Sequence, residues 1–319
     1  MKGGAIVGID LGGTNVRVGR VRGAELEQVE ARQISSEAAA DRVLQEILDS
    51  VDRVLDDTVV GIGCGVPSLV DVDRGTVYSV ENIPSWKEVP LGDELEARYG
   101  IDAFINNDAN AFAVGELYFG KARGYRDIVG LTIGTGLGAG IVVDGRLYGG
   151  SNCGAGEIGA MPYRGQKIES YCSGEFFQRE AGEAGHLIFA RAERGEPEAQ
   201  RLFHRFGVEL GHAILTVLYA YDPELLVLGG SISKAYRWFE GGLRERLADY
   251  AYPHALERLE IAVSEVENIA VLGAAALYLD ARGPGRAMIS RRGVGVSATR
   301  RSRPAADRRQ QRLEPRRQP

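Results

Sequence analysis

The sequence predicts a two-lobed α/β fold, with a duplicated α/β domain and a cleft between the lobes. Two turns rich in glycine and threonine carry this prediction, one within Gly8–Arg17 and the other within Leu131–Gly145, each between two apolar strands. They lie about 120 residues apart and each opens its own α/β segment, as in a duplicated fold that holds one nucleotide between its halves. The 319 residues, 44% of them apolar, are enough to fill two cores of ordinary size.

The first turn places a carboxylate beside a pair of glycines. Glycines let the backbone approach an anion and present N–H groups to it, and the following hydroxyl and amide add neutral donors. Asp10 would repel a bare phosphate, so we expect Mg²⁺, held by Asp10 through water, to lie between them. The predicted ATP and phosphate-binding residues of this turn are Asp10, Gly12, Gly13, Thr14 and Asn15. Taken alone, this turn is also compatible with an ordinary hairpin.

The second turn predicts the same chemistry at Gly134, Thr135 and Gly136. Its glycines do not form a clean G-x-G-x-x-G, and an alternating strand follows them where a dinucleotide site would need a helix. No G-x-x-x-x-G-K-[ST] occurs in the chain, so the P-loop class is also excluded.

Composition indicates a cytoplasmic protein that has no membrane partner. No apolar run is long enough to span a bilayer, and the N-terminus lacks the layout of a signal peptide. The three cysteines, Cys64, Cys153 and Cys172, are odd in number and scattered, which indicates reduced thiols.

Charge divides the chain into an acidic body and a basic tail. The region after residue 280 has twelve Arg against Asp307 and Glu314, a balance of +10 that leaves −16 in residues 1–280. Residues 282–319 have no sustained apolar period, so we expect a disordered, dispensable tail and no nucleic-acid partner. Nucleic-acid contact by this tail stays open as an alternative, and the acidic body is also typical of a salty cytoplasm.

The order of elements can be followed along the first half. A helix starts at Ser35 and Ser36, Asn82–Trp86 forms a loop, and Asp108 sits where a strand becomes a helix rich in small residues. Strands are expected at residues 5–10, 15–21, 58–63 and 101–105, and a further helix near 90–99.

The second half begins with a hairpin at residues 128–148 and an irregular stretch to about 170. Helices near 173–195 and 198–221, a buried strand at 225–228 and a helix near 270–280 follow. We expect an N-terminal lobe at residues 1–117, to which the helix at 268–281 returns, a C-terminal lobe at 118–267, and the tail at 282–319.

Residues 5–280 resemble the ROK family of sugar kinases and sugar-responsive repressors, which has the actin-like ATPase (ribonuclease H-like) fold. The motifs that carry the resemblance occur in the family order: Asp10–Thr14 and Gly134–Gly140 as phosphate motifs, Gly65-Val66-Pro67 as a sugar-side loop, Asn107-Asp108-Ala109-Asn110 as the catalytic motif, Gly156-Glu157-Ile158-Gly159 as the start of a sugar and zinc signature, and Asp222–Gly230 as the adenosine-side strand.

The resemblance implies a kinase that uses ATP and Mg²⁺, with Asp108 as the general base that takes a proton from a sugar hydroxyl. The alternative, that Asp108 only caps its helix, stays open on local sequence alone. Gly229 and Gly230 would contact ATP. The implied sugar-binding residues, whose polar groups would select one stereoisomer, are Pro67, Ser68, Asn82, Asn107, Asp108, Glu157 and Glu169.

The chain departs from the family where zinc is concerned. The family usually has a histidine after its Gly-Glu-x-Gly segment and then a cysteine cluster, but here Ala160 takes the histidine's position and Met161–Glu169 contains neither Cys nor His. A structural zinc site needs about four N or S ligands, so we predict no zinc. Ile168–Gly174 still resembles the end of the signature and keeps Glu169, while Ser68 replaces a glycine of many members.

The resulting hypothesis is an ATP-dependent hexose kinase, glucokinase-like, that acts on small-molecule sugar as a homodimer. Fructose, mannose, N-acetylmannosamine or N-acetylglucosamine is the alternative acceptor. A ROK-type sugar-sensing repressor carries a helix-turn-helix before its first phosphate motif, whereas about seven residues precede Gly8 here. A sugar sensor without catalysis is disfavoured by the intact Asp10, Asp108 and Thr135.

Overall fold

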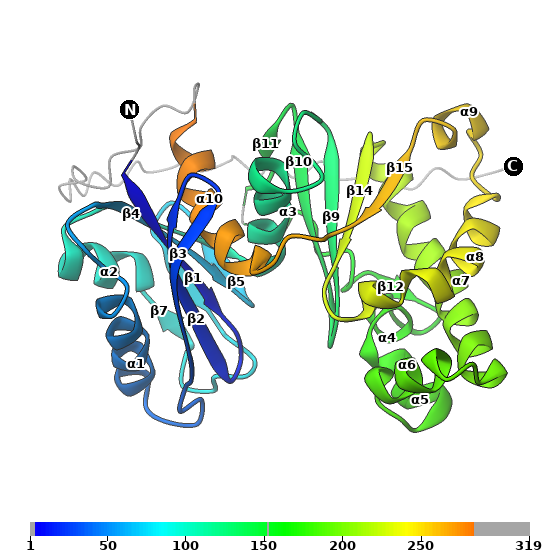
Figure 1. Ribbon diagram of the computed structural model, residues 1–319, viewed down its shortest axis with the longest axis horizontal. Helices are drawn as coiled ribbons and strands as arrows, with labels where there is room; N and C mark the ends of the chain where they lie inside the picture. The colour runs from blue at the N-terminus through cyan, green and yellow to red at the C-terminus, as the bar shows by residue number, and fades with distance from the viewer. Residues whose placement is uncertain (1–3, 152, 284–319) are drawn as a thin grey trace, which may run out of the picture. The chain divides into compact units, whose positions relative to one another are not determined.

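Two five-stranded sheets of the same topology organise the computed structural model, which describes residues 4–151 and 153–283 (Figure 1). Their strand orders are β3–β2–β1–β4–β8 and β11–β10–β9–β14–β15. In both sheets an antiparallel hairpin, β1/β2 or β9/β10, continues into two parallel strands. The repeated order confirms the predicted duplicated α/β fold.

The first sheet is built around strands that are buried on both faces, as expected of parallel strands covered by helices. Every residue of β1 except Asp10 is buried. The strands are β1 (Ala5–Leu11), β2 (Asn15–Arg22), β3 (Glu25–Gln33), β4 (Val59–Val66) and β8 (Ala103–Asn107), and beside them lie α1 (Ala40–Asp52), α2 (Leu91–Tyr99) and a small sheet of β5 (Leu69–Asp71), β6 (Thr76–Tyr78) and β7 (Glu88–Val89).

Two features of this half differ from the sequence-based expectation. The helix expected at Ser35 and Ser36 begins at Ala40, because the N–H and hydroxyl of Ser35 donate to the Glu46 carboxylate (2.7 and 2.8 Å) and hold the preceding loop against the helix side. Strand β3 was not foreseen. It has no fully buried residue and is rich in charge, so it lacks the apolar alternation of a half-buried strand.

The second sheet packs against a helical layer whose core contains five phenylalanines, among them Phe176, Phe206 and Phe239. The strands are β9 (Ile128–Ile133), β10 (Leu137–Val143), β11 (Arg146–Leu147), β14 (Leu225–Gly229) and β15 (Glu260–Val263), and the remaining elements are the hairpin strands β12 (Pro162–Tyr163) and β13 (Gln166–Lys167), α4 (Glu169–Cys172), α5 (Gly174–Ala181), α6 (Gly185–Glu193), α7 (Pro197–Tyr221), the 3₁₀ helix η1 (Ile232–Ala235), α8 (Tyr236–Leu247) and α9 (Pro253–Leu256). The single helix expected at 173–195 is broken at Gly182, which has φ +68° and caps α5.

Helices α3 (Asp108–Phe119) and α10 (Ile269–Arg282) lie between the two sheets and pack against each other (Figure 1). Helix α3 contacts β9 and β10, while α10 contacts β1 and β4. A Cβ atom on Gly115 would lie 2.7 Å from the Cα atom of Gly273, so the two helices cross at backbone distance. Among the described residues, no helix combines the length and apolar character that crossing a membrane requires. The predicted tail lies, from residue 284 onward, outside the described residues.

Candidate active site

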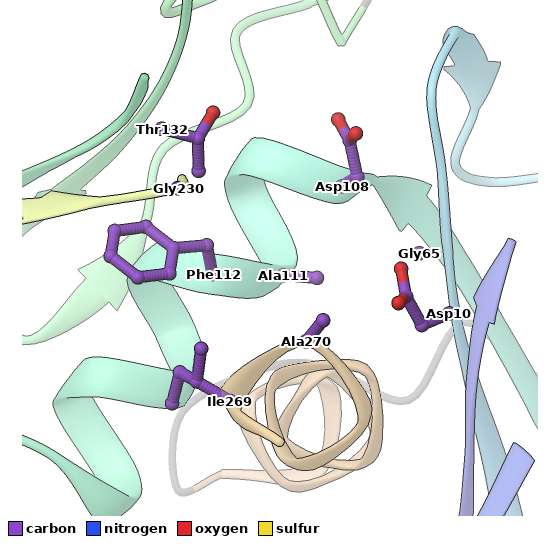
Figure 2. Close-up of a pocket in the computed structure, with 9 residues that line it drawn as sticks. All are labelled: Asp10, Gly65, Asp108, Ala111, Phe112, Thr132, Gly230, Ile269 and Ala270. Atoms are coloured by element: carbon purple, nitrogen blue, oxygen red, sulfur yellow. The ribbon is translucent and has the colours of Figure 1, made fainter. Parts of the chain in front are cut away.

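A cavity of about 210 Å³ opens where strand ends of both sheets meet the starts of α3 and α10 (Figure 2). Asp10 and Gly65 come from the ends of β1 and β4, and Thr132 and Gly230 come from the end of β9 and the residue after β14. The other lining residues are Asp108, Ala111, Phe112, Ile269 and Ala270. Figure 2 shows the Asp10 and Asp108 carboxylates on one side of this space and Thr132 and Gly230 on the other.

Asp108 is the first residue of α3, directly after β8, as the sequence predicts. The helix cap is Asn107, whose side-chain oxygen accepts from the backbone N–H of Ala109 (2.9 Å) and of Asn110 (3.4 Å). One oxygen of Asp108 also accepts from Ala109 (2.8 Å). Asn107 is therefore the main cap, and Asp108 shares only the Ala109 N–H with it, while the Asp108 carboxylate remains accessible to water and lines the cavity.

The surroundings of Asp108 make it a stronger base than an ordinary aspartate. Burial by the cavity walls, with smaller contributions from the charges of Asp10 and Glu157, raises the pKa of Asp108 from 3.8 to about 6, against the lowering effect of the Ala109 N–H. Because water still reaches the side chain, this is the effect of a cleft open to solvent and not of a dry interior. A carboxylate of this pKa is largely ionised at neutral pH and can accept a proton.

Asp10, the next-to-last residue of β1, lines the same cavity with its carboxylate. Burial raises the pKa of Asp10, and the charge of Arg17, its direct neighbour on β2, opposes this shift. A carboxylate oxygen suits Mg²⁺, which is usually bound by one or two carboxylates together with substrate phosphates. Among the described residues, no group of three or more His, Cys, Asp and Glu could hold a metal ion.

Each of the two predicted phosphate-binding turns is closed by a backbone hydrogen bond. Gly12 donates to the Asn15 carbonyl (2.8 Å), and Gly134 donates to the Gly136 carbonyl (3.0 Å). In the first turn the Asn15 amide also donates to the Thr14 hydroxyl (2.9 Å). Thr14, Asn15 and Thr135 are exposed, so their polar groups are accessible to a ligand.

A predicted sugar-binding residue touches each of these turns. A Cβ atom on Gly13 would lie 2.4 Å from the Cβ atom of Asn82, and one on Gly136 would lie 2.4 Å from Oε2 of Glu169. A Cβ atom at Gly13 or Gly136 would therefore force the Asn82 or the Glu169 side chain to shift, since real Cβ atoms essentially never come so close to another atom. The structure therefore brings the predicted sugar-binding and phosphate-binding residues into direct contact.

The remaining residues that are predicted to bind sugar differ in how many hydrogen bonds they already form within the protein. The Asn107 amide donates to the Ser68 carbonyl (3.3 Å) while its oxygen caps α3, so both ends of that side chain already have protein partners. The Ser68 hydroxyl donates to the Tyr78 carbonyl, and Pro67 is half-buried beside it. Glu157 is exposed as a whole, but its carboxyl group is partly desolvated, and this desolvation, followed by the charge of Glu169, raises the pKa of Glu157.

Glu169 is held from both sides. Its Oε2 accepts from the backbone N–H of Leu137 (2.8 Å), and its Oε1 accepts from Nζ of Lys167 (2.7 Å). Lys167 was not singled out from the sequence. Its only signal there is a basic residue two positions before Glu169.

The two glycines predicted to contact ATP have different surroundings. Gly230 has φ +84° and lines the cavity. Gly229 is buried, and a Cβ atom there would lie 2.4 Å from the Phe112 ring. Gly229 therefore allows α3 to pack closely against β14. Thr132, Phe112, Ile269 and Ala270 carry no signal of this location in the sequence, because only the fold brings them to the cavity.

A buried polar network lies next to the predicted catalytic motif, and nothing in the sequence indicates it. The Asn106 side-chain oxygen accepts from the Asn110 amide (2.9 Å), from the Cys153 thiol (3.2 Å) and from the backbone N–H of Asn107 (2.8 Å). Such a network fixes the backbone just before Asp108.

Comparison with known proteins agrees with this geometry. The model of the ROK family matches residues 6–281. The chain belongs to the ROK family. It is 33% identical over 306 residues to a glucokinase of Thermotoga maritima, covering 85% of this chain and 96% of that protein. It is also 33% identical over 306 residues to an N-acetyl-D-glucosamine kinase of Pectobacterium carotovorum, covering 85% and 98%.

Solved ROK structures have the same fold. The ROK family glucokinase of Streptomyces griseus, in complex with glucose and AMPPNP, superposes with a TM-score of 0.74 at 26% identity over 86% of this chain and 99% of that one. The ROK hexokinase of Thermus thermophilus gives a TM-score of 0.72 at 28% identity, with 86% and 98% covered. The fold of this ROK protein is therefore the actin-like ATPase fold that its motifs imply.

Proposed function

We propose that this ROK protein phosphorylates a hexose, most readily glucose to glucose 6-phosphate, with Asp108 as the general base. The enzyme class, an ATP-dependent sugar kinase, is supported by the family and by relatives named glucokinase and N-acetyl-D-glucosamine kinase. The single observation that carries the proposal is the Asp108 carboxylate at the start of α3, with a pKa of about 6, in one cavity with Asp10 and Gly230.

The proposed reaction is a direct phosphoryl transfer. The Asp108 carboxylate takes the proton of the sugar hydroxyl while that oxygen forms a bond to the γ-phosphorus of ATP, and the bond to the β,γ-bridging oxygen breaks to release ADP. Asp10 would hold Mg²⁺, which neutralises charge on the phosphates when bound. The exposed groups of the two glycine turns would orient the phosphates, while Glu157, Glu169, Asn82 and the Pro67–Ser68 loop would bind the sugar.

A second acceptor class is favoured by one observation. Ala160 stands where the family resemblance places a sugar-contacting histidine, and this side chain is small and exposed. A smaller side chain at this position would leave room for an N-acyl substituent, which favours N-acetylglucosamine or N-acetylmannosamine as the alternative acceptor. Mannose and fructose are further alternatives that the family resemblance implies.

A coupled assay of ADP release over a panel of hexoses and N-acylated amino sugars tests the proposal. We expect the largest kcat/KM for glucose and a strict need for Mg²⁺. A larger kcat/KM for an N-acylated sugar would replace glucose by that sugar, while ADP release that no sugar accelerates would refute the kinase assignment.

Other parts of the hypothesis rest on the resemblance and the sequence. We propose lobes of residues 1–117 and 118–267, and the packing of α10 against β1 and β4 supports the return of residues 268–281 to the first of them.

A cytoplasmic homodimer that needs no nucleic acid is proposed as the working form. Light scattering of the purified protein, with and without sugar, tests the dimer.

A further inference from the structure

The hairpin of β12 and β13 ends at Lys167, two residues before Glu169, and its own strand pairing stabilises it only weakly. Its two pairs are Pro162 with Lys167 and Tyr163 with Gln166. The two turn residues, Arg164 and Gly165, both have positive φ (47° and 77°), as in a type I′ turn. An isolated two-stranded hairpin is marginally stable in water, so contacts outside the hairpin must fix its position.

Those contacts come from α7 and α4. Glu209 on α7 accepts from Nη1 of Arg164 (2.7 Å) and from the hydroxyl of Tyr163 (3.2 Å). The Arg164 guanidinium lies 4.8 Å from the centre of the Tyr163 ring and 5.8 Å from that of Tyr171 on α4. The two rings meet edge to face at 5.1 Å. We call Tyr163, Arg164, Tyr171 and Glu209 the Glu209 cluster.

The other end of the hairpin reaches the candidate sugar site. Lys167 donates to one oxygen of Glu169, and the backbone N–H of Leu137 donates to the other. The N–H of Glu169 donates to the Gly159 carbonyl (2.9 Å), which ties the segment to the residues around Glu157. The position of the hairpin thus determines where Lys167 and Glu169 stand beside the phosphate turn.

The cluster occupies the segment in which the family resemblance places a zinc motif. Residues 161–169 contain no Cys or His. Over the described part of the chain, no set of His, Cys, Asp and Glu side chains is arranged to hold a metal ion. The available donor set does not fit zinc, whereas an arginine that lies near two tyrosine rings and pairs with a carboxylate fits cation–π contact and charge-assisted hydrogen bonding.

We propose that the Glu209 cluster, without a metal ion, positions Lys167 and Glu169 for binding the sugar. The proposal rests on the proposed function, in which Glu169 contacts a hexose. Members of the cluster are positioning residues, since they act through the hairpin and do not touch the reacting atoms. Lys167 is the additional residue that this arrangement brings to the sugar side.

The test compares Glu209→Ala with Glu209→Gln, which keeps one oxygen acceptor, and with Tyr163→Phe, which removes a single hydroxyl. Losing charge-assisted hydrogen bonds commonly weakens a coupled interaction about tenfold. We expect Glu209→Ala to raise the KM for sugar about tenfold with the KM for ATP unchanged, Glu209→Gln to restore part of the loss, and Tyr163→Phe to have a smaller effect of the same kind.

Glu30→Ala is the matched control, because Glu30 pairs with Arg53 at 2.8 Å on another part of the chain. Lys167→Met should raise the KM for sugar as well. Its effect should not add to that of Glu209→Ala, because both variants disturb the same contact. Full additivity would overturn the proposal, and so would a KM for sugar that changes no more in Glu209→Ala than in Glu30→Ala.

Hydrogen exchange of residues 159–170 in the absence of sugar separates this proposal from the proposed function. We expect faster exchange there in Glu209→Ala than in the wild type. If the wild type phosphorylates no sugar, the proposed function fails and the exchange result alone decides the positioning role. A lower thermal midpoint with unchanged exchange and unchanged KM for sugar would mean that the cluster only stabilises the fold, and would overturn the proposal. Poor folding of Glu209→Ala leaves Tyr163→Phe to decide.

Discussion

Replacing Asp108 by Asn removes a proton acceptor and leaves the shape of the side chain almost unchanged. We expect kcat to fall by about 10²- to 10⁴-fold, the usual contribution of general base catalysis. Sugar binding should change little, because an amide still fits beside the Asn107 cap and Ala109. The loss should therefore appear in kcat and not in the affinity for sugar.

The pKa of Asp108 adds a second magnitude to this prediction. With a pKa of about 6, the wild-type carboxylate is about nine-tenths ionised at pH 7 and about one-tenth ionised at pH 5. Since only the ionised form accepts a proton, kcat/KM should fall as the pH falls through about 6, approaching tenfold per pH unit below it.

The assay is coupled ADP release between pH 5 and pH 8, with sugar affinity measured by calorimetry. Asp144→Asn is a matched control, because Asp144 lies in an exposed turn with φ 54°, paired only on the surface with Arg126. The reasoning is refuted if Asp108→Asn keeps more than about a tenth of the wild-type kcat. A wild-type acidic limb near pH 4 would instead refute the assigned pKa.

Four further results are expected. Asp108→Asn should raise the thermal midpoint at pH 7.5, because the pKa of Asp108 is raised from 3.8 to about 6 and ionisation of this group therefore destabilises the fold. The gain in thermal midpoint should shrink as the pH falls from about 6 toward 3.8. An unchanged thermal midpoint at every pH would contradict this expectation. Gly136→Ala places a Cβ atom 2.4 Å from Oε2 of Glu169, so the KM for sugar should rise severalfold in steady-state kinetics, whereas Gly145→Ala at an open turn should affect only stability. Protein purified without added zinc should hold none in stoichiometric amount by elemental analysis, and one tightly bound zinc per chain would overturn that expectation. Truncation after Gly283 should leave kcat and the KM for ATP unchanged at low and moderate salt; a large rise in that KM at both salt concentrations would show that the tail acts at the active site.

Local signals in the sequence were enough to predict the fold and to single out Asp10 and Asp108, which the structure brings to one cavity. The apolar strand before Asp10, the glycine turns and the strand-to-helix junction at Asp108 each involve neighbouring residues, so their structure follows from short-range rules. The repeated strand order followed because each glycine turn opens its own half. The helix rich in small residues became α3, whose residues Ala111 and Gly115 meet the strand end at Gly65 and the helix α10.

Contacts between distant residues could not be predicted in the same way. Glu209 lies 45 residues after Arg164, and a single sequence contains nothing that pairs them. Lys167 is an exposed base, and nothing in the sequence indicates that the hairpin places it against Glu169. The start of α1 was misplaced because Ser35, a good capping residue by type, donates to Glu46 on the side of the helix instead. In each case the tertiary partner decides the outcome, and the local preference does not.

The repeated topology also gives the site a direction. Asp10 is the next-to-last residue of β1 and pairs with Gly65, while Thr132 is the next-to-last residue of β9 and pairs with Gly229, so the two halves present corresponding positions to one cavity. Two identical halves would receive an elongated ligand equally well in either orientation. Here one corresponding position is an anion and the other a neutral hydroxyl, and that single difference in charge distinguishes the two ends of the cavity.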